Sequence, residues 1–89
     1  MPRVSFTRAL KRFVPAPSAE VEGTTVAEAL GAVFGSHPAL RGYVLDDQGA
    51  VRRHVNVFVN GWPIKDRQRL SDPVAPRDEI YVFQALSGG

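Results

Sequence analysis

Apolar residues recur with the spacing of an amphipathic α-helix from Thr25 to about Ser36. The apolar stripe of this segment consists of Val26, Leu30, Val33 and Phe34. Thr25 and Glu28 have the spacing of a capping box, in which each side chain satisfies a free backbone N–H of the first turn. Gly35 followed by Pro38 is typical of a helix end. The pattern therefore predicts one main helix that buries a single face.

Alternation of apolar and polar residues predicts strands before and after this helix. Strands are expected at residues 3–8, 19–22, 40–45, 51–59 and 79–85. Asn60-Gly61 is typical of a two-residue hairpin turn, and Pro63 limits the strand that returns from it to a sheet edge. Prolines in the segment 10–17 indicate a loop. The chain is therefore expected to combine several strands with one helix, without internal repeats.

The order of strand, strand, helix and then strands indicates an α+β protein, with one helix across a mixed sheet of four to five strands. The first and last strands each need a partner, and both are satisfied when they lie side by side at the centre of the sheet. That arrangement is a β-grasp, or ubiquitin-like, fold. We expect residues 1–86 to form this domain and residues 87–89 to form a flexible tail. The expected core consists of Val4, Phe6, Val26, Leu30, Val33, Phe34, Val57, Val59, Ile80 and Val82.

The last strand and the long strand before it each present an aliphatic and an aromatic side. If the aliphatic sides face the helix, Phe58, Tyr81 and Phe83 stand on the open side of the sheet. Exposed aromatic residues that cluster on a small domain indicate a docking surface. The alternative is that the loop at 10–17 or the segment 62–70 folds over these rings. We interpret the three rings as candidate partner-binding residues.

The composition argues against several classes of function. The 89 residues include no cysteine, so no disulfide, thiolate metal site or cysteine nucleophile can form. No apolar stretch approaches the ~18 residues that span a bilayer. The first residues also lack the apolar region of a secretory signal, so we expect a cytoplasmic protein without a membrane partner. The net charge of +2 is too small to indicate nucleic-acid binding.

Candidate catalytic groups are sparse. The histidines, His37 and His54, lie far apart without the spacing of metal ligands. No convergent acidic pair, Ser-His-Asp arrangement or glycine-rich phosphate loop is recognisable. A basic stripe could be formed by Arg52, Arg53, Arg67, Arg69 and Arg77. It lacks the interleaved aromatics of single-strand binders, so a solvated surface is the simpler interpretation. We therefore expect neither enzymatic activity nor a bound cofactor or metal.

The last three residues are Ser87-Gly88-Gly89, directly after the apolar last strand. Glycine permits backbone conformations closed to other residues and lets another surface approach closely. A carboxylate on Gly89 would carry no side chain and could reach into a narrow active site. The alternative is a frayed terminus, which most domains have. Because a single serine separates the glycines from the expected strand, we interpret the tail as functional.

The chain resembles the ubiquitin-like sulfur-carrier family that includes ThiS, MoaD and CysO. The resemblance rests on the capped helix from Thr25, the strand at 54–60, the Pro76-Arg77-Asp78-Glu79-Ile80 entry to the last strand, and the segment 85–89. The segment 45–56, with its Asp-x-x-Gly turn and basic pair, is similar to CysO-like members. Trp62-Pro63 and Gln84 depart from the pattern.

The resemblance implies that the Gly89 carboxylate is the group that reacts. In this family a ubiquitin-activating-like enzyme uses ATP to adenylate the terminal carboxylate, and a persulfide sulfur then replaces AMP to leave a thiocarboxylate. The carrier is a substrate of this adenylyltransferase and sulfurtransferase, is not itself an enzyme, and binds no cofactor. Gly88 would keep the tail narrow, while Leu86, Ser87 and the three aromatic residues would contact the partner.

Several sulfur-transfer roles are compatible with the resemblance. A CysO-like role in cysteine biosynthesis is favoured, with a cysteine synthase as sulfur acceptor and a JAMM-type metalloprotease as a further partner. The alternatives are the small subunit of molybdopterin synthase, whose large subunit would be the acceptor, and a carrier for thiamin or tRNA thiolation. A protein modifier joined to lysines and a plain β-grasp binding module with an inert tail are the other classes of function.

Overall fold

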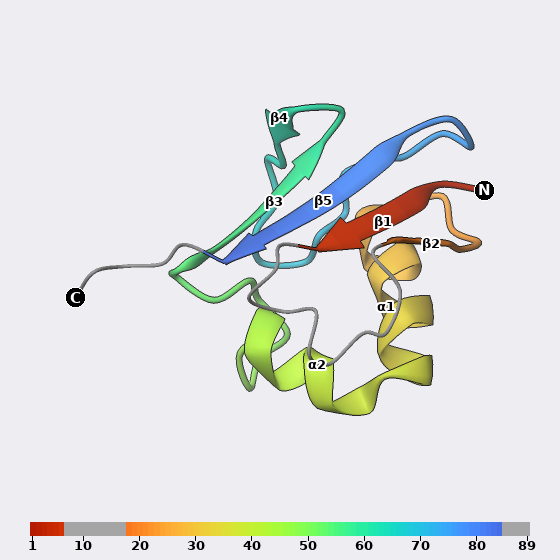
Figure 1. Ribbon diagram of the computed structural model, residues 1–89. Coiled ribbons are helices and arrows are strands. Elements are labelled where there is room, and N and C mark those ends of the chain that lie inside the picture. The colour runs from red at the N-terminus through yellow and green to blue at the C-terminus, as the bar shows by residue number, and fades with distance from the viewer. Residues whose placement is uncertain (7–17, 85–89) are drawn as a thin grey trace.

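The computed structural model describes residues 1–6 and 18–84 of the chain. In this part a five-stranded mixed sheet runs in the order β2-β1-β5-β3-β4, and two helices lie on the same side of it (Figure 1). The elements are β1 (Arg3–Phe6), β2 (Ser18–Glu20), α1 (Val26–Ser36), α2 (Pro38–Val44), β3 (Val55–Val59), β4 (Trp62–Pro63) and β5 (Glu79–Gln84).

The first and last strands lie side by side in the interior of the sheet, as the sequence predicted. β1 pairs in parallel with β5, with Val4 opposite Ile80 and Phe6 opposite Val82. β5 pairs antiparallel with β3 on its other side, and β2 and β4 form the two edges. This order is that of a β-grasp fold, and it confirms the predicted α+β class.

The hairpin at Asn60-Gly61 connects β3 to a short edge strand. Both residues have positive φ angles, 52° at Asn60 and 87° at Gly61, as the expected two-residue turn requires. The Asn60 side chain ties this turn to the start of β5. Its Nδ2 donates to Asp78 Oδ1 (2.9 Å), and its Oδ1 accepts from Glu79 N–H (3.0 Å). β4 then ends at Pro63, so the predicted restriction to an edge is confirmed.

Helix α1 begins at the predicted cap. The Oγ1 atom of Thr25 accepts a hydrogen bond from Glu28 N–H (3.2 Å). The Glu28 carboxylate accepts from the backbone N–H (2.8 Å) and the hydroxyl (3.0 Å) of Thr24, so the return bond of the capping box falls one residue before the cap. These two bonds lower the pKa of Glu28 below its ordinary value. The charged carboxylate therefore stays beside the helix N-terminus, where negative charge is favourable.

A second helix replaces the strand that we expected at 40–45. α2 follows α1 directly, so the prediction of a strand here was wrong, and a second, shorter helix accompanies the main helix α1. Pro38 lies in the first turn of α2, where its missing N–H would have had no helical partner. Leu40 and Val44 are both buried. Residues four apart share a face of a helix and also a face of a strand, so their spacing alone could not separate the two structures.

Strand β3 is shorter than expected, because it begins at Val55 rather than at Val51. Val51 instead forms an isolated bridge with Leu45. The guanidinium of Arg67 donates to both Arg52 O (2.8 Å) and Val55 O (2.7 Å), and these bonds hold the turn that precedes the strand. Contacts with distant segments therefore divide what the pattern predicted as one strand.

The hydrophobic core lies between the sheet and the two helices. Nine of the ten predicted core residues are buried, and the tenth, Val59, is partly buried and packs against them. The core also includes Ala29, Leu40, Val44, Leu45, Val51, Val55, Ile64, Leu70 and Val74. Neither helix of the described residues has the length and apolar character needed to cross a membrane.

Candidate functional site

Three aromatic side chains stand on the side of the sheet away from the helices, and we call Phe58, Tyr81 and Phe83 the aromatic face. Phe58 lies directly opposite Tyr81 in the pairing of β3 with β5. The ring centroids of Tyr81 and Phe83 are 6.4 Å apart with planes tilted by 38°, in the range of attractive aromatic pairs. Tyr81 is 40% exposed and Phe83 is 38% exposed, while Phe58 is half-buried. The predicted location of the rings is confirmed, and their role in binding a partner stays a prediction.

The segment 62–70 contributes two side chains to the core, whereas Pro63 is exposed and lies opposite Phe58 at the sheet edge. Ile64 and Leu70 are buried in the core. The Asp66 carboxylate holds the segment in a turn, because it accepts hydrogen bonds from the Ser71 hydroxyl and from the backbone N–H groups of residues 68, 69 and 71. These bonds, that from the Ser71 hydroxyl above all, lower the pKa of Asp66. Asp66 is therefore a turn-forming residue that stays ionised at neutral pH.

The predicted tail residues lie outside the described part of the chain. This applies to Leu86, Ser87, Gly88 and Gly89, and to the loop at 10–17 that was considered as a cover for the aromatic face. Strand β5 ends at Gln84, opposite Val55 at the start of β3. The five residues from 85 to 89 span at most about 17 Å when extended. A partner that binds Gly89 must therefore approach the end of the sheet that carries Phe83.

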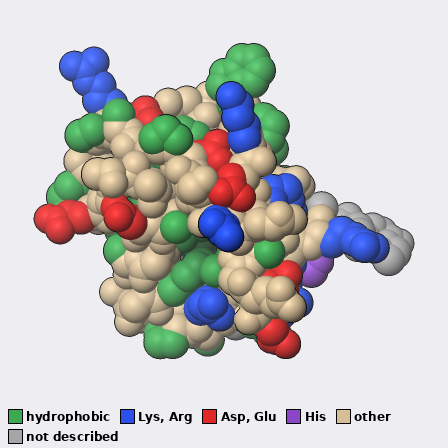
Figure 2. Space-filling model, turned by 180° about the vertical axis from the view of Figure 1, so that it is seen from behind, with side chains coloured by type: hydrophobic (Ala, Val, Ile, Leu, Met, Phe, Trp, Pro, Cys, Tyr) green, Lys and Arg blue, Asp and Glu red, His purple; other side chains and the backbone are tan. Residues whose placement is uncertain are grey.

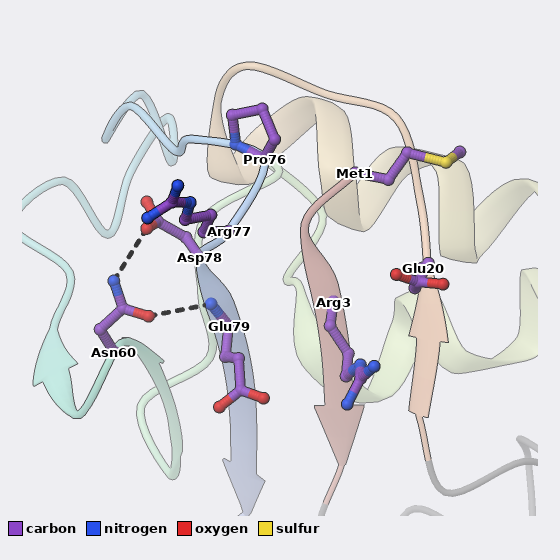
Figure 3. A pocket seen from close by; sticks show the side chains of 8 residues that line it. All are labelled: Met1, Arg3, Glu20, Asn60, Pro76, Arg77, Asp78 and Glu79. Carbon is purple, nitrogen blue, oxygen red and sulfur yellow. Dashed lines mark hydrogen bonds between the residues drawn. The ribbon is translucent and has the colours of Figure 1, made fainter.

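A polar pocket lies at the opposite end of the sheet, around the starts of β1 and β5 (Figure 3). Its volume is about 420 Å³, and Arg3, Glu20, Asn60, Arg77, Asp78 and Glu79 are among the residues that line it. The Asp78 carboxylate accepts from Ala75 N–H (2.8 Å) and from Asn60 Nδ2 (2.9 Å), and these bonds lower its pKa. The pocket combines both signs of charge, and its hydrogen bonds stabilise two turns. The sequence offered no signal for it, because its residues come from four separate segments.

The histidines and arginines that the sequence singled out lie on different elements. His37 is half-buried between the two helices, and His54 is exposed just before β3. Within residues 1–6 and 18–84, no three His, Cys, Asp or Glu side chains come together as metal ligands would. Arg52 Nε donates to Gly42 O (2.7 Å), so this arginine, like Arg67, supports the backbone. Two of the five arginines of the expected basic stripe therefore stabilise the fold.

Comparisons with known proteins find relatives along nearly the whole chain. Residues 6–89 match the ThiS family. Small archaeal modifier protein 1 of Haloferax volcanii is 39% identical over 71 residues, which cover 79% of this chain and 77% of that protein. Its crystal structure matches with a TM-score of 0.80 at 32% identity and covers 99% of this chain and 98% of that chain.

A second solved structure extends the likeness of fold. In the crystal structure of the Amycolatopsis orientalis BexX/CysO complex, the matched chain has a TM-score of 0.88 and is 24% identical, with all of both chains covered. At that identity the match concerns the fold alone. Together with the modifier protein, it confirms the β-grasp arrangement of sheet and helices.

Proposed function

This chain belongs to the ThiS family of ubiquitin-like small modifiers and sulfur carriers, and we propose that it carries sulfur on the carboxylate of Gly89. The observation that carries the proposal is the pair of exposed rings on β5, the strand that leads toward Gly88 and Gly89. A docking surface beside a short tail is what a carrier needs when another protein supplies the catalytic groups.

The proposed chemistry begins with activation of the carboxylate. A terminal carboxyl group has a pKa near 3.5, so at neutral pH it is an anion and a poor electrophile. A ubiquitin-activating-like enzyme transfers AMP from ATP to the Gly89 carboxylate and releases pyrophosphate. A persulfide sulfur then displaces AMP, and a thiol reduces the resulting acyl disulfide to leave a thiocarboxylate. The chain supplies the reacting group, while ATP and the catalytic residues belong to the activating enzyme.

In this proposal the aromatic face binds the activating enzyme, with Leu86 and Ser87 as further contacts. Tyr81 and Phe83 are exposed on β5, and both helices of residues 1–6 and 18–84 lie on the other side of the sheet (Figure 1). Aromatic side chains are enriched among the residues that dominate protein interfaces. The short reach of residues 85–89 requires the enzyme to cover the adjoining end of the sheet. These two features support a single continuous interface that includes the tail.

The acceptor of the sulfur distinguishes several versions of the proposal. We favour a CysO-like role in cysteine biosynthesis, with a cysteine synthase as acceptor and a JAMM-type metalloprotease as a further partner, because the segment 45–56 is similar to CysO-like members. The small subunit of molybdopterin synthase and a carrier for thiamin or tRNA thiolation are the alternatives. The likeness to the chain in the BexX/CysO complex is one of fold and does not separate these roles.

A protein modifier is the second candidate function, and one observation favours it. The Haloferax volcanii relative, 39% identical over 71 residues, is named a small archaeal modifier protein. A modifier would share the adenylation of Gly89. In a modifier, the activated glycine would then be joined to a lysine amine of another protein. In a sulfur carrier, the activated glycine would receive sulfur instead.

The intact mass of the protein after activation tests both candidates. The chain is incubated with ATP, a sulfur source and an activating enzyme encoded beside it. We expect one oxygen-to-sulfur exchange, and deletion of Gly89 should abolish it without changing the melting temperature, because a terminal glycine has no side chain to bury. Attachment to a lysine of another protein would favour the modifier. If no ATP-dependent change occurs, the inert-module interpretation replaces both.

A further inference from the structure

A second hollow lies on the helical side of the molecule and has an apolar floor. It has a volume of about 200 Å³ between α1, the end of α2 and the segment around residues 69 and 70. The floor is formed by Leu30, Phe34, Leu45 and Leu70, all of which are buried. Figure 2 shows a hollow of hydrophobic side chains bordered by basic ones on that face. The hollow belongs to neither the aromatic face nor the tail.

The rim of this hollow is basic. Arg41 of α2 and Arg69 line it, and no aspartate or glutamate does. Among residues 1–6 and 18–84, no carboxylate forms a hydrogen bond or a salt bridge with either guanidinium, and two acids close in sequence bond to backbone groups. Asp46 accepts from the backbone N–H groups of Gln48 and Ala50 (2.8 and 3.0 Å). Asp66 likewise accepts from backbone N–H groups. The two arginines therefore bring positive charge to the edge of an apolar cavity whose lining contains no acidic residue.

Gly31 keeps the hollow open. It lies in the middle of α1 and lines the cavity, and a Cβ built on it meets no atom within 4 Å. Glycine is a poor helix former compared with alanine, and here nothing in the described packing requires it. A larger residue would improve the helix and fill the cavity. Of the helical glycines with open surroundings, Gly31 is the one that lines the hollow, so the choice of glycine there leaves room for a ligand.

We propose that this hollow binds an acidic segment of a partner protein, which inserts one leucine-sized side chain between Arg41 and Arg69. The volume decides the class of ligand. Small-molecule sites span roughly 300 to 1,000 Å³, so a cavity of about 200 Å³ suits a single side chain better. The apolar floor contacts that side chain, and the two arginines bind carboxylates that flank it in the partner segment.

This inference goes beyond the proposed function, because it needs neither ATP nor the tail. The hollow lies among the helices, and the aromatic face lies on the other side of the sheet. A partner in the hollow therefore leaves the aromatic face open. The two sites could be occupied at once, by an activating enzyme on one side and by an acidic partner on the other.

Titration followed by amide NMR spectra tests the proposal on the free chain. The probe is a capped peptide with one leucine between two pairs of aspartates. Its controls carry serine in place of the leucine or asparagines in place of the aspartates. We expect shifts at the amides of Gly31, Gly49 and Leu70, with none at Tyr81 or Phe83. Both control peptides should bind at least roughly tenfold more weakly, since one lacks the apolar contact of the leucine and the other lacks the charged contacts of the aspartates.

Two leucine variants separate the hollow from general effects on the helix. Gly31→Leu fills the cavity and should abolish the shifts. Gly35→Leu makes the same change one turn later in the helix. A Cβ at Gly35 also meets no atom within 4 Å, but Gly35 does not line the hollow, so this variant should bind the peptide normally. Both variants should fold at least as stably as the original chain, because each replaces a helical glycine. Lost binding in Gly31→Leu would then report the filled cavity.

Several outcomes would overturn the proposal. Equal binding by Gly31→Leu, or shifts confined to the aromatic face, would place the peptide elsewhere. Undiminished binding by the Arg41→Gln, Arg69→Gln double variant would refute the role of charge. Shifts of the same amides with protein concentration alone would identify a second copy of the chain as the occupant. None of these results bears on thiocarboxylate formation, so failure here is distinguishable from failure of the proposed function.

Discussion

Phe83 provides the sharpest test of the aromatic face, because removal of its ring should affect binding more than folding. The residue lies on β5, an interior strand that is paired on both sides, and it is 38% exposed. Its backbone stays paired with Asn56 whatever the side chain is. The change Phe83→Ser removes the ring and leaves a small polar side chain that water can reach.

The two expected energies follow from the exposure of the ring. Complete burial of a phenylalanine side chain contributes about 1.5 to 3 kcal/mol, so the partly exposed ring should contribute roughly 1 to 2 kcal/mol to folding. For a domain of this size each kcal/mol lowers the melting temperature by about 4 to 8 °C, which leaves the variant folded at room temperature. Loss of an aromatic anchor in an interface costs ~2 kcal/mol or more, a factor of roughly 30 in affinity.

The assay measures affinity for the activating enzyme and the free energy of unfolding in urea on the same preparations. Trp62→Ser is the matched control. Trp62 is 77% exposed, yet its register opposite Val59 places it on the other side of the sheet from the aromatic face. We expect Phe83→Ser to weaken binding strongly and Trp62→Ser to leave it nearly unchanged.

Two results would contradict this reasoning about Phe83. If both variants bind equally well, the aromatic face is not the docking surface. If Phe83→Ser loses about 4 kcal/mol of folding stability, a value typical of large core truncations, the ring acts as a core residue. The exposed fraction of Phe83 would then misrepresent its contribution to the fold.

Two further predictions concern the fold that presents these surfaces. Leu30→Ala should lower the free energy of unfolding by roughly 3 kcal/mol in urea denaturation, because the side chain is 1% exposed and leaves a cavity under α1; an effect below 1 kcal/mol would contradict the core assignment. Asp78→Asn should flatten the loss of stability below about pH 4. Hydrogen bonds from Ala75 and Asn60 lower the folded-state pKa of Asp78, so its contribution is present above the unfolded pKa and is lost as the pH falls through the folded pKa. If the melting temperatures of the variant and the original chain fall equally below about pH 4, this carboxylate does not contribute to folding stability.

The elements that the sequence predicted well are those set by local pattern. Helix α1 has an apolar stripe and a side-chain cap, and its observed bounds agree with the prediction. The aromatic face follows from the two-residue period of β3 and β5, because alternate residues of a strand must point to opposite sides. Once Val57 and Val82 face the helices, Phe58 and Phe83 cannot.

The errors arose where distant segments decide the structure. Leu40 and Val44, four residues apart, share one face of a strand as well as one face of a helix, and the helix forms where Pro38 can start it. The turn before β3 depends on Arg67, which is 15 residues away from Arg52 in sequence. The hollow was not predicted at all, because its rim and floor come together only when α1, α2 and the segment around 69 and 70 pack against one another.

The two proposed surfaces owe their independence to the sheet itself. Strands β3 and β5 place aliphatic side chains on the side that meets the helices and aromatic ones on the other, so a single strand, β5, contributes Val82 to the core and Phe83 to the open face. A ligand on the open face contacts atoms that the hollow does not contain. Mutations at sites without shared partners have nearly additive effects. Variants of Phe83 and of Gly31 therefore report on separate binding events, and a coupling between them would require the core between α1 and the sheet to rearrange.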